Sequence, residues 1–352
     1  MLEKSEHKPG RYFLFIAYLQ IIGIVLVVMG HSFHEYPDGQ FGKTMLWYQM
    51  LYTVRMPLFM FVSGFLMDFT TSARERSWGN FALMKLKRLL LPYIVLSLIT
   101  FVPRALMSGL ADDPVELSWK GLGNALADPE NCGIAYFWFL QSSLTLLIVV
   151  YGLLCMSRRA RMNPAVFYIA VATGIALLDI LPISIPPYFS LRKTVSLGIY
   201  FIAGAAYSHW QTLLDSRIRW SSVWLFILLG IMWASAFFAS EKGELPVAIC
   251  SFLGIMMMIS LAKILEARHI TFLDHLKGAN YIIFLLSWYF NVAAQQVLHH
   301  YTDLPWWVYS LLSLTFGIYV PWLFYKWMCF HPDNRFSRAM ALLLGQSIKR
   351  KR

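Results

Sequence analysis

The residues of this sequence best suited to proton transfer lie near the end of its first apolar segment, which spans about 12–33. An imidazole titrates near neutral pH, so His31 could take the proton of a hydroxyl group that attacks a carbonyl carbon. Gln20 precedes His31 by eleven residues, or about three helical turns and about 16 Å, so both lie on one helix face. Glu35 follows His31 by four residues and could orient the imidazole. Because polar groups on a membrane helix face the protein or water, the stripe predicts either a reaction site or satisfied interior polar residues.

Two groups of cationic side chains could bind the anionic part of a substrate. Arg55 lies in the second apolar segment, two residues before Pro57, where an unpaired cation is costly. Lys85, Lys87 and Arg88 come at the mouth of the third segment and could form charge-assisted hydrogen bonds to phosphate. Simpler interpretations stay open. Arg55 could extend its side chain to water from a kinked packing helix, and the three basic residues could simply reflect the excess of Lys and Arg in cytoplasmic segments of membrane proteins.

The ninth apolar segment carries an uncharged polar stripe. Asn291, Gln295 and His299 follow i, i+4, i+8 spacing and therefore share one helix face. Such a stripe suits a hydrated cavity for a neutral polyhydroxy ligand, or equally hydrogen bonds between helices. Trp138 opens the fourth segment among aromatic residues typical of a membrane interface.

Membrane helices must position all of these residues. The chain has 352 residues, of which 58% are hydrophobic and only 14% are charged, against about 25% charged in soluble domains. We predict an all-α, polytopic membrane bundle of about ten transmembrane helices, in one integral-membrane domain over 1–352. The apolar windows are 12–33, 46–67, 88–108, 136–156, 164–181, 194–210, 220–239, 246–264, 281–299 and 306–327.

The distribution of basic residues predicts the orientation of these helices. With the N-terminus in the cytoplasm, 23 of the 30 Lys and Arg residues fall in cytoplasmic segments. This predicts an N-in, C-in topology, with His31 toward the extracytoplasmic side, 109–135 as an external loop and 329–352 as a basic cytoplasmic tail near anionic lipid. The net charge of +11 then reflects topology, and no nucleic-acid partner is expected. The four cysteines are far apart and lack metal-ligand spacing, so no metal site is expected either.

Four motifs occur in order along the first half of the chain: VVMGH at 27–31, RMPLFMFVSGF at 55–65, KLKRLLLPY at 85–93 and WFL at 138–140. Their order and spacing resemble the integral-membrane acyltransferase-3 family, in particular its sugar O-acetylase branch, which includes fucose 4-O-acetylase-like proteins. The resemblance is specific over about 12–160. Beyond that stretch it rests on the ten-span hydropathy.

The resemblance implies transfer of an acyl group, usually acetyl, from cytoplasmic acyl-CoA (acetyl-CoA) to a hydroxyl of an extracytoplasmic or lipid-linked glycan. It also implies a multi-pass protein of the bacterial inner membrane, with His31 as the catalytic histidine. Together with the residue patterns, it gives the following candidates: catalytic His31 and Glu35; donor-binding Lys85, Lys87, Arg88 and Gln20; substrate-binding Arg55, Trp138, Asn291 and Gln295.

The sequence departs from the resembled family at two positions. The family's first helix carries Arg or Lys where this chain has Gln20, and usually Asp where it has Ala17. Glutamine can donate a hydrogen bond but supplies no positive charge. Either another cation substitutes, or the donor is bound differently, or activity is reduced. Two other functions therefore stay open: a transporter or exporter of polysaccharide or a small solute, and a non-catalytic member of a glycan-assembly complex.

Overall fold

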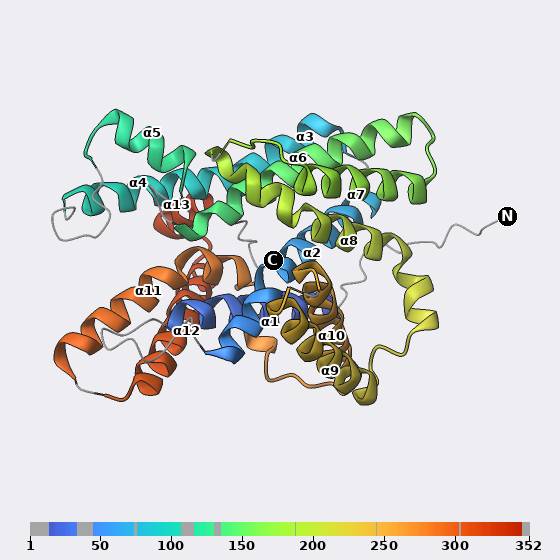
Figure 1. The fold of residues 1–352 in the computed structure, drawn as a ribbon. Helices are drawn as coiled ribbons and strands as arrows, with labels where there is room; N and C mark the ends of the chain where they lie inside the picture. The colour runs from blue at the N-terminus through green and yellow to red at the C-terminus, as the bar shows by residue number, and fades with distance from the viewer. Residues whose placement is uncertain are drawn as a thin grey trace. The chain divides into compact units, whose positions relative to one another are not determined.

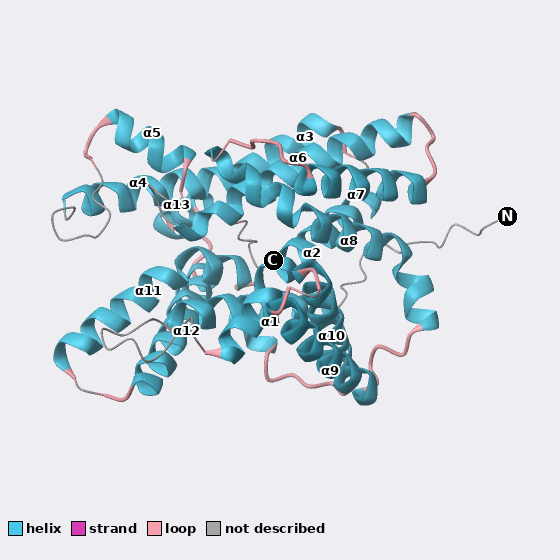
Figure 2. Cartoon of the chain, viewed as in Figure 1, coloured by secondary structure: helices cyan, strands magenta, loops and turns pink. Residues whose placement is uncertain are grey.

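The computed structural model describes residues 14–33, 45–73, 76–106, 116–129, 135–186, 188–243, 245–302 and 304–346, which contain helices and loops but no strand (Figure 2). Figure 1 gives the order of the helices. They are α1 (Leu14–Ser32), α2 (Leu46–Ala73), α3 (Trp78–Lys85), α4 (Leu91–Leu106), α5 (Trp119–Ala127), α6 (Trp138–Arg159), α7 (Pro164–Ile180), α8 (Leu191–Arg217), α9 (Val223–Glu241), α10 (Val247–Ala267), α11 (Asn280–Tyr301), α12 (Trp306–Phe330) and α13 (Arg335–Leu343). The π-helical turn η1 (Leu86–Leu90) joins α3 to α4.

Among the described residues, eight helices are long and apolar enough to cross a membrane, which confirms a polytopic helical membrane protein. They are α1, α2, the continuous rod from α3 to α4, α6, α9, α10, α11 and α12. The other two predicted windows also form helices. However, α7 has only 17 residues, and α8 continues well beyond the predicted end at 210. The N-in, C-in orientation stays a prediction.

One predicted boundary was wrong. The third helical rod begins at Trp78 rather than near 88, because the hydroxyl of Ser77 caps it by accepting a hydrogen bond from the Asn80 amide at 3.4 Å. The basic cytoplasmic tail 329–352 stays a prediction; within that range α12 ends at Phe330, and α13 follows and packs against α4. Hydropathy marks only the apolar part of a helix and therefore misses such polar ends.

The helices form two compact units, and the chain passes between them inside α2, inside α8 and again between His331 and Pro332. The first unit draws on 1–62 and 210–331, and the second on 63–209 and 332–352. Neither is a continuous stretch of sequence. The single domain over 1–352 stays a prediction.

In the first unit α1 is the central helix. It packs against α10, α11 and α12, and most of its side chains are buried (Figure 1). This explains why α1 is apolar almost all round, since a helix that contacts others on several sides has no polar face.

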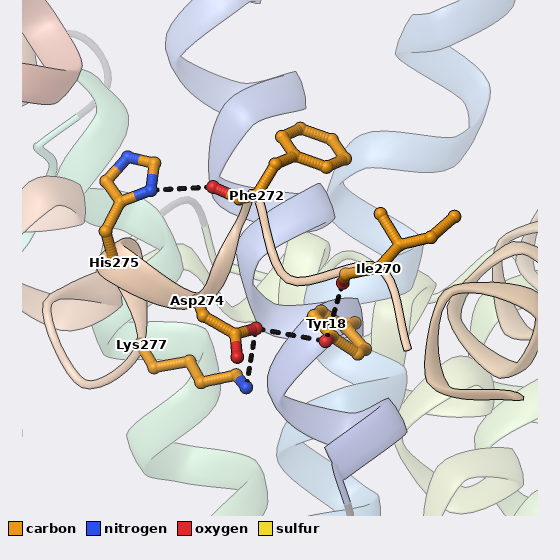
Figure 3. Close-up of polar contacts among 6 residues, drawn as sticks. All are labelled: Tyr18, Ile270, Phe272, Asp274, His275 and Lys277. Atoms are coloured by element: carbon orange, nitrogen blue, oxygen red, sulfur yellow. Dashed lines mark hydrogen bonds and ion pairs between the residues drawn. The ribbon is translucent and has the colours of Figure 1, made fainter. Parts of the chain in front are cut away.

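The loop between α10 and α11 is fastened to α1 through Tyr18 (Figure 3). The Tyr18 hydroxyl lies 2.9 Å from the Ile270 carbonyl oxygen and 3.0 Å from Oδ1 of Asp274, and it can donate to either acceptor. The Lys277 ammonium lies 2.7 Å from the same carboxylate oxygen. Trp322 of α12 donates from Nε1 to the His275 carbonyl oxygen at 2.7 Å, so the loop is held from two helices.

We expect Asp274→Asn to lower the stability of the purified protein at neutral pH by less than about 1 kcal/mol, because both ion-pair partners are partly exposed. The hydrogen bond from Lys277, assisted by that from Tyr18, lowers the pKa of Asp274 below its usual value of 3.8. A carboxyl group whose pKa is lower in the folded state contributes stability above its unfolded pKa and loses it as the pH falls through the folded pKa. The difference in Tm between wild type and variant should therefore shrink as the pH is lowered from about 5 to about 3. A constant difference over that range would contradict this assignment.

In the second unit, Gly64 of α2 lies against the backbone of α8. A Cβ at Gly64 would lie 1.8 Å from the carbonyl oxygen of Phe201, so only glycine permits this approach. The sequence motif Ser63-Gly64 predicts such a contact, and the structure confirms it. In the same unit, α3 packs against α6.

Candidate active site

His31 is the penultimate residue of α1 and lies half-buried in the first unit. The carbonyl groups of the last four residues of a helix have no N–H donor within the helix, so they accept hydrogen bonds from other groups. At the end of α1 the donors to the carbonyl oxygens of Gly30 and Ser32 come from α2 and α11, so the backbone that carries His31 is held from two sides.

Two side chains of α11 hold the end of α1. Asn291 donates from Nδ2 to the carbonyl oxygen of Val28 at 3.3 Å, and Gln295 donates from Nε2 to that of Ser32 at 3.1 Å. Nε2 of Gln295 also lies 3.2 Å from the hydroxyl of Ser313 on α12. Asn291 and Gln295 are both buried. Of the two interpretations left open by their spacing, these contacts match hydrogen bonding between helices, and substrate binding by the pair stays a prediction.

Gly317 of α12 provides the space that Asn291 occupies. A Cβ at Gly317 would lie 1.8 Å from Oδ1 of Asn291 and 2.9 Å from the Val28 side chain. Asn291 is therefore confined between α1 and α12. The third member of the predicted stripe, His299, lies farther along α11.

The side chain of Arg55 lies directly against the backbone of Gly30, the residue before His31. A Cβ at Gly30 would lie 1.7 Å from Nη1 of Arg55, so a side chain there would displace the guanidinium from this position. The guanidinium carbon lies 4.0 Å from the centroid of the Tyr52 ring, a favourable cation–π distance. The Tyr48 hydroxyl donates to the Gly30 carbonyl oxygen at 3.0 Å and completes the contact between α2 and α1.

Arg55 is only 8% exposed, yet its Nε and Nη1 atoms have no hydrogen-bond partner among the described residues. Buried, unpaired guanidinium N–H groups are unfavourable for folding. A cavity of about 10 Å³ lies beside them, lined by residues of α1 and α2, and it is close to the size of one water molecule. Such a group is suited to receive an anionic or carbonyl oxygen of a ligand.

Sequence reasoning identified Arg55 as a candidate but missed Tyr48 and Tyr52. Their spacing to Arg55 is i, i+4, i+7, which places all three on one face of α2. This signal was present in the sequence, although it did not show that the face meets the end of α1.

The two remaining candidates associated with the first apolar segment are Gln20 and Glu35. Gln20 is half-buried in α1, on the same helix as His31 as predicted. Glu35 lies outside the described residues.

The cationic candidates Lys85, Lys87 and Arg88 belong to the second unit. Lys85 ends α3, and its ammonium lies 5.1 Å from the ring centroid of Phe81. Lys87 and Arg88 are exposed and lie in the π-helical turn η1, a local geometry that is frequent at functional sites. The backbone of Arg88 is covered by Gly345, whose positive φ of 64° favours glycine.

Trp138 is the first residue of α6, and the Lys193 ammonium lies 4.4 Å from its ring centroid. One turn along α6, sequence reasoning missed a buried hydrogen-bond network around Gln141. Its Nε2 donates to the Leu126 carbonyl oxygen at 2.8 Å and its Oε1 accepts from the Ser190 hydroxyl at 2.8 Å. The network fastens α5, which lies in the predicted external loop 109–135. A glutamine inside an apolar segment was the available signal.

A comparison with protein-family models assigns the chain to a family. The family model Acyl_transf_3, described as an acyltransferase domain, matches residues 13–326. No curated protein and no solved structure matches the chain. Since the family model covers most of the chain, from the start of α1 into α12, this protein belongs to the acyltransferase-3 family.

Proposed function

We propose that this membrane acyltransferase moves an acyl group, usually acetyl, from acyl-CoA to a hydroxyl of a glycan acceptor, extracytoplasmic or lipid-linked. The donor approaches from the cytoplasm and the protein lies in a bacterial inner membrane. The observation that carries the proposal is the buried Arg55 guanidinium against Gly30, one residue from His31, whose Nε and Nη1 atoms have no hydrogen-bond partner among the described residues. It supports a site that combines a proton acceptor with a positive charge.

In this proposal His31 is the general base. An imidazole nitrogen takes the proton of the acceptor hydroxyl while its oxygen attacks the thioester carbonyl carbon. The carbon–sulfur bond breaks, the acyl group becomes an ester, and the departing thiolate takes the proton from the imidazolium. A base in this role contributes about 10²–10⁴-fold to the rate.

Arg55 stabilises the negative charge that develops on the thioester oxygen. Its N–H donors are already desolvated, so little reorganisation is needed when that charge appears. In this way Arg55 supplies the cation that the family places at the position of Gln20. The hydrogen bonds from Asn291 and Gln295 keep the end of α1 in place during the reaction.

The proposal can be tested on cell-surface glycans of the native host. O-acetyl esters released by mild alkali should be present with wild-type protein and absent after deletion of its coding sequence. Complementation should restore them, and His31→Ala at equal membrane level should not. Unchanged ester content after deletion would contradict the proposed acceptor class.

A prediction for the binding of the acyl donor follows from the basic residues at the junction of α3 and η1. If Lys85 and Arg88 contact phosphates of acyl-CoA, the double variant Lys85→Gln/Arg88→Gln should raise the apparent KM for acetyl-CoA more than tenfold, because charge-assisted hydrogen bonds contribute about 1.5–3 kcal/mol each. The matched control is Arg217→Gln/Arg219→Gln, which removes two exposed charges at the end of α8 and just beyond it. Equal KM values for both double variants would assign the cluster to membrane topology alone.

A further inference from the structure

The second unit contains a groove of about 750 Å³ where α3 packs beside α6. Trp78 donates from Nε1 to the Ile148 carbonyl oxygen at 3.0 Å and lies so close to Gly152 that a Cβ there would be 2.9 Å from the same nitrogen. The Tyr151 hydroxyl donates to the Arg76 carbonyl oxygen at 2.7 Å. These contacts join the start of α3 to α6 and fix one side of the groove.

One end of the groove is cationic. Arg76, Arg158 and Arg159 line it, and within the described part of the chain none of the three forms an ion pair. Arg158 and Arg159 are the last two residues of the membrane-spanning helix α6, so they lie where that helix leaves the hydrocarbon. Guanidinium groups bind phosphate oxygens with two parallel hydrogen bonds.

The rest of the groove is apolar and open toward the surroundings of α6. Val149, Leu153 and Met156 line it and are 51%, 39% and 66% exposed. On a membrane-spanning helix such side chains face lipid. A ligand that fills both ends must therefore carry an anionic headgroup and a hydrocarbon chain.

We propose that this groove binds one anionic phospholipid molecule, with its phosphate at Arg76, Arg158 and Arg159 and an acyl chain along Val149, Leu153 and Met156. Trp78, half exposed, meets the middle of α6 at Ile148 and adds an aromatic side chain to the wall of the groove. The apolar wall distinguishes this ligand from a soluble phosphate compound, which would leave the wall exposed. The test of this proposal requires no acyl transfer, so its outcome is independent of the reaction proposed above.

The test compares phosphatidylglycerol with phosphatidylcholine in titrations of the detergent-purified full chain, with bound lipid counted by native mass spectrometry. We expect at least tenfold tighter binding of phosphatidylglycerol. Arg158→Gln/Arg159→Gln should weaken that binding at least tenfold, because each basic residue near an anionic lipid contributes about fivefold. Equal affinities for the two lipids in the wild type would overturn the proposal.

A matched control removes two exposed arginines of α13, as Arg335→Gln/Arg338→Gln. It should weaken binding less than threefold, and a loss equal to that of the groove variant would mean that only general charge attraction operates. Glycerol 3-phosphate should fail to displace the lipid. If glycerol 3-phosphate displaces phosphatidylglycerol at equal concentration, the arginines bind a soluble phosphate compound, and the proposal is overturned.

Two further variants separate lipid binding from folding. Arg158→Lys/Arg159→Lys keeps both charges and should retain most of the affinity for phosphatidylglycerol. Met156→Glu changes an exposed side chain and places a negative charge in the groove. It should weaken phosphatidylglycerol binding at an unchanged Tm. Undiminished binding by this variant would place the lipid elsewhere.

Discussion

Replacing His31 with alanine is expected to lower the rate of acyl transfer by about 10²–10⁴-fold, to the background of the assay, while the protein stays inserted and folded. The loss follows because the proposal assigns the proton of the acceptor hydroxyl to the imidazole, which alanine lacks. The fold should survive because the contacts that hold the end of α1 use backbone carbonyl oxygens, which alanine retains. The measurement is acetyl incorporation at matched protein levels, with the Tm as the check on folding.

The variant His31→Gln serves as the control for hydrogen bonding. Glutamine can donate and accept a hydrogen bond, but it cannot take up the proton at neutral pH. It should therefore be as inactive as alanine. Activity near the wild-type rate in His31→Ala would show that this histidine is not the general base.

The second large effect is expected at Arg55, where activity and stability should change in opposite directions. Arg55→Met keeps an extended side chain against Tyr52 but removes the charge and the unpaired N–H groups. We expect transfer to fall about 10²–10³-fold, the usual effect of losing a donor to a developing oxyanion. Because a buried, unpaired cation is unfavourable for folding, the Tm should stay constant or rise. A purely structural arginine would instead lower activity and Tm together.

Gln20→Arg is the matched gain-of-charge variant. In the wild-type background it should preserve or raise transfer if a cation at that position helps to bind the donor. Combined with Arg55→Met, it should restore part of the lost activity if the two cations have overlapping roles. If the double variant recovers no activity, the positive charge that transfer requires must lie at position 55, beside Gly30.

The sequence predicts the first span closely, and the reason is the composition of α1. Its predicted window, 12–33, nearly coincides with Leu14–Ser32 because the segment is apolar throughout. The rod from α3 to α4 begins about ten residues before its window, since Lys85, Lys87 and Arg88 interrupt the apolar signal without interrupting the helix. In α8 the polar residues Gln211 and Asp215 hide the last two turns in the same way.

The candidate site was predicted in its residues but not in its contacts. Helical spacing places Asn291 and Gln295 on one face, yet it does not reveal that this face meets the carbonyl groups at the end of α1. Arg55 and Gly30 belong to different spans, and only their three-dimensional arrangement shows that the guanidinium occupies the space where a Cβ of residue 30 would lie. Contacts between helices depend on packing, which periodicity within one helix does not encode.

The central claim is tested most directly by reconstituting purified wild-type protein in sealed vesicles with labelled acetyl-CoA and a glycan extract from the native host. We expect label to appear on the glycan as an alkali-labile ester, at a rate proportional to the amount of protein. Vesicles with His31→Ala should show no labelled glycan above background. Vesicles with Arg55→Met should show only a trace of labelled glycan. Wild-type vesicles that leave the glycan unlabelled while acetyl-CoA stays intact would contradict the acyltransferase account.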